Sequence, residues 1–174
     1  MIQYRSSIFE TNSSSTHSIV IADKVPDNLP ETIDFQIGEF GWERECLDTI
    51  TEKASYLYTA ACAIAHRDVQ DAIIDLLTPF GIECVFSVEP QFKSSKYTPE
   101  LQWLDNGYVD HCTETKPFVE YCFDNAFNML AFLCSDDSFI LTGNDNESEE
   151  EYGDGWWDKA ENVTYPHTTF YKGN

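Results

Sequence analysis

The chain has 174 residues, of which 42% are hydrophobic and 14% aromatic, so it holds enough apolar material for a folded core and is not a disordered chain. Its 31 Asp and Glu residues against 10 Lys and Arg residues give a formal net charge of −21. Because affinity for free nucleic acid and for anionic lipid comes largely from cationic side chains, this charge argues against direct binding to either and favours a basic protein partner.

The first residues, MIQYRSSIFE, lack the basic region, the apolar run and the cleavage site of a secretory signal, and no apolar segment is long enough to cross a membrane. We therefore expect a cytoplasmic protein with no membrane partner. None of the six cysteines forms a C-x-x-C pair, which predicts reduced thiols in the core. The length predicts one domain over residues 1–174.

In chain order, strands are expected at residues 3–9 and 18–22, joined by a loop over 10–18 in which every side chain is polar. The alternation of TIDFQIGEF predicts a third strand over residues 32–40. Apolar spacing of three and four predicts a helix over 45–66 that includes Leu47. A second helix is expected from a cap at Asp68 to a stop at Gly81, with an apolar stripe that reaches Phe80.

The segment IECVFSV predicts a buried strand, and the two prolines of residues 90–107 predict an irregular connection. One helix is expected from about Pro117 to Leu133, followed by a strand in SFILTG and an edge strand in VTYPHTTFY. The fold class is therefore α+β: a mixed or mostly antiparallel sheet of about five strands with about three helices packed on it. An acidic insertion is expected at about residues 144–161.

The polar segment 10–18 is the first candidate site. Glu10 fits the role of a base or metal ligand, Ser13, Ser14 and Ser15 fit phosphate binding, and His17 fits proton transfer near neutral pH. The same residue types also form Ser/Thr-rich turns that satisfy their own backbone, and residue type does not decide between these alternatives.

Two shorter segments also carry polar groups. Asp110 and His111 are adjacent in GYVDHCT, and Asn144 and Asp145 end the strand in TGNDN. Asn and Asp bind hard cations and also form turns, so each segment taken alone fits an ordinary surface loop.

The segments RSSIFETNSSSTHSIVI, GYVDHCT and FLCSDDSFILTGNDN occur in this order. Together they resemble a family of small proteins encoded by phages and prophages of Gram-positive bacteria. The resemblance implies that the motif positions converge on one site in a protein of the bacterial host cytoplasm. Cys112 departs from the pattern, because a polar residue such as Gln is expected there. The implied catalytic residues are Glu10, His17, Asp110 and His111, and the implied substrate-binding residues are Asn12, Ser13, Ser14, Ser15, Asn144 and Asp145.

The chain also resembles anti-CRISPR proteins that disable Cas9 by truncating its guide RNA. This resemblance implies a phosphodiester-cleaving site directed at RNA held in a Cas ribonucleoprotein. A free ribonuclease with a charge of −21 would repel its substrate, whereas a protein docked on the basic channels of a Cas effector meets RNA only in complex with that partner.

The rival hypothesis is a binder without catalysis. The segment ESEEEYGDGWWD could imitate nucleic-acid phosphates and block a basic host protein, or it could be an ordinary solvated acidic loop. The candidate partner-binding residues are Glu147, Glu149, Glu150, Glu151, Trp156 and Trp157.

The sequence leaves two chemical routes open. A divalent cation such as magnesium, held by Glu10, Asp110 and Asp145, would activate water. Alternatively, His17 and His111 would act as acid and base, with the RNA 2′-hydroxyl as nucleophile. The oligomeric state is not predicted.

Overall fold

Strand β1 (Ser15–Ala22) lies inside the main sheet, and in the computed structural model all of its residues are buried. It pairs antiparallel with β9 (Phe139–Asn144) on one side and with β10 (His167–Lys172) on the other, and β9 pairs antiparallel with β4 (Cys46–Leu47). The strand order β10-β1-β9-β4 confirms the edge strand that follows Pro166. The structure describes residues 15–41, 43–65, 68–110, 115–144 and 155–172, and the expected strand over residues 3–9 lies outside them.

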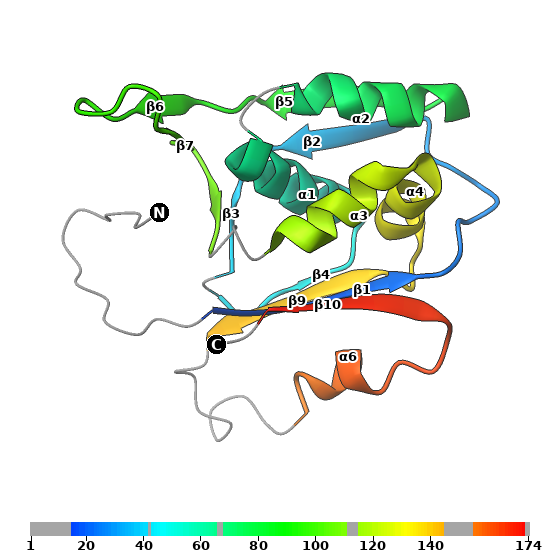
Figure 1. Ribbon diagram of the computed structural model, residues 1–174. Helices are drawn as coiled ribbons and strands as arrows, with labels where there is room; N and C mark the ends of the chain where they lie inside the picture. Colours follow the sequence, from blue (N-terminus) through cyan, green and yellow to red (C-terminus); the bar gives the residue numbers. More distant parts are fainter. Residues whose placement is uncertain (1–14, 42, 66–67, 111–114, 145–154, 173–174) are drawn as a thin grey trace.

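The two faces of this sheet are covered differently (Figure 1). Ile19 and Ile21 of β1 belong to the large core shared with helices α1 (Ile50–Ala65), α3 (Lys116–Asp124) and α4 (Ala126–Cys134). Val20 belongs to a smaller cluster on the opposite face, under the short helix α6 (Asp158–Glu161). The alternation of a strand therefore gives β1 two separate apolar clusters.

A second layer lies beyond the helices (Figure 1). It contains β2 (Thr32–Gln36), which pairs parallel with β5 (Glu83–Val88), and helix α2 (Val69–Leu77) with its 3-10 continuation η1 (Thr78–Phe80). A two-residue parallel pair joins β3 (Glu39–Phe40) to β8 (Tyr108–Val109). The segment expected to form one strand over residues 32–40 is thus divided between two partners.

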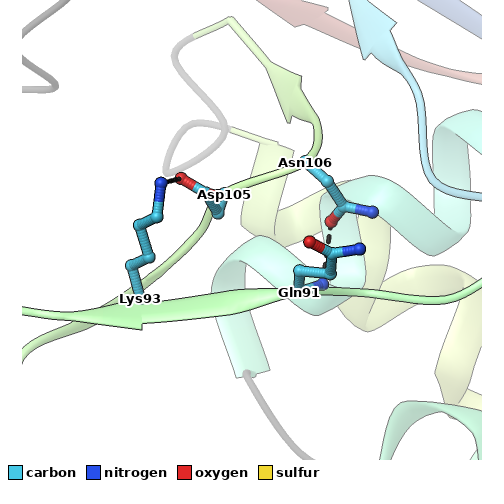
Figure 2. Close-up of polar contacts among 4 residues, drawn as sticks. All are labelled: Gln91, Lys93, Asp105 and Asn106. Atoms are coloured by element: carbon cyan, nitrogen blue, oxygen red, sulfur yellow. Dashed lines mark hydrogen bonds and ion pairs between the residues drawn. The ribbon is translucent and has the colours of Figure 1, made fainter.

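The segment expected to be irregular contains a hairpin, β6 (Phe92–Ser94) and β7 (Gln102–Leu104). Figure 2 shows the polar contacts beside it: Lys93 Nζ lies 2.7 Å from the Asp105 carboxylate, and Asn106 Oδ1 accepts from the Gln91 backbone N–H at 2.8 Å. The expectation of no regular structure was wrong here, because Pro99 lies in the connection between the strands, where no ladder N–H is needed.

The helix expected over residues 45–66 begins later, at Ile50, and Leu47 lies in β4. A reciprocal capping box fixes this start. Glu52 N–H donates to Thr49 Oγ1 at 3.3 Å, and the Glu52 carboxylate accepts from Thr49 N–H at 3.1 Å.

The helix expected from Pro117 to Leu133 is divided at Asn125, whose backbone is extended at φ −160° and ψ 161°. Its side chain accepts from Asn128 N–H at 2.9 Å and so caps α4. This break turns Phe127, expected in the core, toward solvent, where it is 50% exposed.

Helix α2 and strand β5 differ from expectation in detail. Asp68 precedes α2 but makes no side-chain cap and has a left-handed backbone at φ +61°, whereas the stop at Gly81 is confirmed at φ +78°. Phe80 is 50% exposed rather than buried, and β5 has mostly exposed residues because, among the strands that the structure describes, β2 is its one pairing partner.

The predicted α+β class is confirmed, with three helices on one face of an antiparallel sheet and further strands in two-stranded pairs. The described cysteines, Cys46, Cys62, Cys84, Cys122 and Cys134, are free thiols. Within the described ranges, no helix has the length and apolar character to cross a bilayer.

Candidate functional site

The polar residues that open β1 are buried between two paired strands. Ser15, Thr16, His17 and Ser18 all have exposed fractions of 8% or less. Their assignment to a loop was wrong, because β9 pairs with all four residues and β10 pairs with His17 and Ser18, and this pairing replaces the hydrogen bonds that a loop backbone would make to water. Glu10, Asn12, Ser13 and Ser14, from the first part of the polar segment, lie outside the described residues.

His17 is completely buried, and its Nδ1 lies 2.7 Å from the hydroxyl of Tyr56 on α1. The Tyr56 ring is held in turn by edge contacts with Phe40 and Phe118, at centroid distances of 5.4 and 6.0 Å. These contacts fix the orientation of the imidazole, so its Nε2 edge faces one defined part of the interior.

Gly41 forms the wall beside that Nε2 edge. Its φ is +106°, and a Cβ placed on it would lie 2.3 Å from His17 Nε2 and 3.2 Å from Asp110 Cβ. The imidazole edge and the Asp110 side chain therefore both approach the backbone of Gly41. Only glycine accepts this backbone conformation and this close approach together.

Asp110 reaches this position through the short β3–β8 pair. Its backbone N–H donates to the carbonyl of Phe40 at 2.9 Å, directly after the pairing of Phe40 with Val109. A residue of the GYVDHCT motif thus lies beside a residue of the N-terminal polar segment. His111, the next candidate, lies outside the described residues.

The third motif, TGNDN, reaches the same end of the sheet through the register in which β9 pairs with β1. Ser15 lies opposite Asn144, and His17 lies opposite Thr142. Thr142 Oγ1 donates to the Glu43 carbonyl at 2.6 Å and accepts from Glu45 N–H at 3.2 Å. The TGN segment therefore links β1, with which it pairs, to the chain after Gly41, with which Thr142 forms hydrogen bonds. Asp145, the next candidate residue, lies outside the described residues.

The charges near this chain segment are mainly negative. The pKa of Glu45 is raised by burial and by the neighbouring charges of Glu43 and Glu52. Among the residues that the structure describes, no cluster of three or more His, Cys, Asp or Glu side chains could hold a metal ion. Two of the three expected magnesium ligands, Glu10 and Asp145, lie outside that part of the chain.

Trp156 and Trp157 pack against β9 on the face of the main sheet that carries the smaller apolar cluster. Trp156 Nε1 donates to the Thr142 carbonyl at 3.2 Å, and the Arg44 guanidinium lies 5.3 Å from the centre of its ring. Trp157 approaches so closely that a Cβ on Gly143 would lie 3.1 Å from its ring. Both indoles are half-buried and pack against the smaller apolar cluster, so packing within the fold explains the two tryptophans without a binding partner. The candidate residues Glu147, Glu149, Glu150 and Glu151 lie outside the described residues.

Gly41, Tyr56 and Thr142 were not singled out by the sequence. Tyr56 lies in a helix rich in apolar residues and does not differ there from a core aromatic. A glycine directly after a short strand was the one available signal for Gly41, because such positions often take a positive φ.

Comparison of the chain with protein-family models, curated proteins and solved structures finds no match.

Proposed function

We propose that this chain is a phage-encoded anti-defence protein of the anti-CRISPR type, which cleaves the guide RNA of a Cas effector ribonucleoprotein. The observation that carries the proposal is the meeting of His17 and Asp110 at Gly41. These two residues come from separate motifs: His17 was selected from the sequence as a proton-transfer group, and Asp110 as an implied catalytic residue and metal ligand. An imidazole and a carboxylate brought together from distant parts of a chain are a common arrangement for proton transfer.

In this proposal His17 transfers protons through Nε2, because Nδ1 is held by the Tyr56 hydroxyl, and the chain at Gly41 has to move aside for RNA to reach the completely buried imidazole. As the base, His17 removes the proton of an RNA 2′-hydroxyl. The 2′-oxygen then forms a bond to phosphorus, and the bond from phosphorus to the 5′-oxygen breaks. The leaving 5′-oxygen takes up a proton from the second acid–base group of this route, assigned to His111 in the sequence analysis, and the products are a cyclic phosphate and a 5′-hydroxyl. Asp110 stabilises the imidazolium formed on the way, and Ser15 lies at the strand end where phosphate would approach.

The net charge supports an effector-bound substrate. A charge of −21 opposes encounter with free RNA, and a basic channel on the partner supplies the cations that this chain lacks. The proposed RNase is therefore active on loaded guide RNA and poor on naked RNA.

The test uses labelled guide RNA, free and loaded in Cas9, with either magnesium or EDTA. The key variant is His17→Asn, because an Asn side chain can keep a polar partner for Tyr56 but cannot transfer a proton at neutral pH. We expect specific cleavage of loaded RNA by the wild type and none by His17→Asn, with both proteins folded at the assay temperature as shown by their thermal unfolding curves. The EDTA lane decides between the metal-assisted and metal-free routes.

Cleavage by His17→Asn at the wild-type rate would make the His17–Tyr56 pair purely structural. Tyr58→Phe is the matched control, because Tyr58 is also buried on α1 and hydrogen-bonded, but to Gln70. Its cleavage should equal that of the wild type.

A non-catalytic acidic mimic is the second candidate, and the net charge favours it independently of the site. It predicts inhibition of the partner with intact RNA in every lane. Replacing Glu147, Glu149, Glu150 and Glu151 by Gln should then abolish inhibition, whereas the nuclease proposal predicts that His17→Asn does so.

A further inference from the structure

Cys46 and Lys159 are in direct contact across the outer face of the main sheet. The Lys159 Nζ lies 2.7 Å from the Cys46 Sγ. This is as short as a strong N–H···O hydrogen bond, although sulfur is a larger atom than oxygen. The two residues are far apart in the sequence, on β4 and on α6, so the contact is created by the tertiary fold.

The fold holds each partner in place. Cys46 pairs with Leu141 of β9, and its side chain packs against the small apolar cluster that contains Leu141 and Phe139. Lys159 crosses the ring of Phe139, with Nζ 4.8 Å from the ring centre. Ala160, the next residue of α6, is buried in the same cluster. The two reactive atoms therefore meet without further ordering of the chain.

Cys46 lies nearer the surface than three of the other described thiols, because it is only partly buried whereas Cys62, Cys122 and Cys134 are buried. Burial raises the pKa of Cys62 to about 12 and that of Cys134 to about 11, and it raises the pKa of Cys84 and Cys122 as well. Such thiols stay protonated and react slowly with peroxide, because the thiolate is the reactive form. Cys46 is partly buried, and its thiol donates to the Asp48 carboxylate at 3.8 Å, so its sulfur is accessible from the surface.

We propose that Cys46 and Lys159 form a covalent sulfur–nitrogen link when the protein meets hydrogen peroxide. In the first step the Cys46 sulfur attacks one peroxide oxygen, the O–O bond breaks, and the thiol proton leaves with the other oxygen as water. Sulfur is oxidised by two electrons to a sulfenic acid, and the peroxide is reduced.

In the second step Lys159 loses its ammonium proton to solvent, and the amine lone pair attacks the sulfur. The S–N bond forms and the S–O bond breaks. The oxygen leaves as a second water, and its proton comes from the amine, so no further oxidant is needed. The product is a sulfenamide, a species that sulfenic acids form by condensation with nitrogen. A thiol reductant reverses it.

The link would join β4 to α6 and so fix the segment that carries Trp156 against β9. Trp156 donates to the Thr142 carbonyl, and Thr142 lies opposite His17. Oxidation would therefore stabilise the side of the sheet that faces away from α1, α3 and α4. This side lies behind the candidate site. This inference does not depend on the proposed function.

The experiment treats the folded chain with hydrogen peroxide, blocks remaining thiols with iodoacetamide and maps non-reduced peptides by mass spectrometry. We expect the Cys46 and Lys159 peptides as one species, lighter than their sum by two hydrogen atoms, and separated again by dithiothreitol. Cys84, a half-exposed thiol on β5, is the internal control and should stay unlinked.

Lys159→Arg is the matched variant, because it keeps the positive charge but removes the nucleophilic amine. In this variant dimedone should trap Cys46 as the sulfenic acid. Recovery of the wild-type Cys46 and Lys159 as separate peptides after peroxide treatment overturns the proposal, as does a link from Cys46 to any other residue.

Discussion

Nδ1 of His17 and the hydroxyl of Tyr56, 2.7 Å apart and both completely buried, join the main sheet to helix α1 through one polar contact inside the core. The surrounding side chains are aromatic, with Phe40 and Phe118 against the Tyr56 ring. A buried polar group that loses its partner keeps the whole cost of its desolvation. This pair therefore sets the position of His17 and also makes the core sensitive to its loss.

Replacing Tyr56 by Phe should destabilise the protein by about 1–3 kcal/mol, because His17 loses its partner at Nδ1 while the ring contacts remain. The measurement is urea unfolding. Tyr58→Phe should cost less, because the partner that it leaves, Gln70, is only partly buried and can turn to water. Equal losses in the two variants would contradict a special role for the His17–Tyr56 bond.

Gly41→Ala should destabilise the protein more than Gly81→Ala. Both glycines have a positive φ, so each substitution carries a backbone cost of about 1–2 kcal/mol. A Cβ on Gly81 would meet nothing within 4 Å, whereas a Cβ on Gly41 would overlap His17 Nε2. The difference between the two unfolding free energies, expected at about 1–3 kcal/mol, measures that overlap. A difference near zero would show that the site relaxes freely around Gly41.

Lys53 is 1% exposed, and its Nζ donates to the carbonyls of Ser135 and Ser138 at 2.7 and 2.9 Å. Burial lowers its pKa from 10.5 to about 8. Between these two values the unfolded chain binds more protons than the folded chain, so the contribution of Lys53 to stability rises with pH.

Compared with Lys53→Met, the wild type should therefore gain about 1 kcal/mol of relative stability between about pH 7.5 and pH 9. Unfolding in urea at both pH values checks this, and taking the difference between the two proteins removes the titration of the groups that do not interact with Lys53; Cys134 does interact with it. A difference that falls with pH would contradict the lowered pKa.

Asn125→Ala should cost about 1 kcal/mol, because the Asn125 side chain caps α4 through the N–H of Asn128. Asp68→Gly should cost nothing or stabilise the protein, because Asp68 makes no side-chain cap and holds a positive φ that glycine adopts freely. Thermal unfolding of the two variants distinguishes a capping residue from one that only precedes a helix.

Local patterns in the sequence determined several elements, including one strand whose pairing partners lie far away in the chain. The apolar stripe of α2, the stop at Gly81 and the strand in SFILTG depend on periodicity and on backbone preference, and all were predicted. The α+β class follows from their order. The break at Asn125 and the start of α1 are also determined by local residues, through a helix cap and a capping box. The sequence analysis missed both, because the apolar periodicity continues across these positions and predicts longer helices.

Tertiary structure alone decided which polar residues meet. Ser15 to Ser18 have the composition of a turn, and they are a strand because β9 pairs along all four residues and β10 pairs with the last two, His17 and Ser18. Asp110 lies beside His17 because β8 pairs with β3 and Gly41 leaves room for both side chains. Hydrogen bonding between strands and steric fit depend on residues distant in the chain, so composition and spacing identified the candidates while only the fold brought them together.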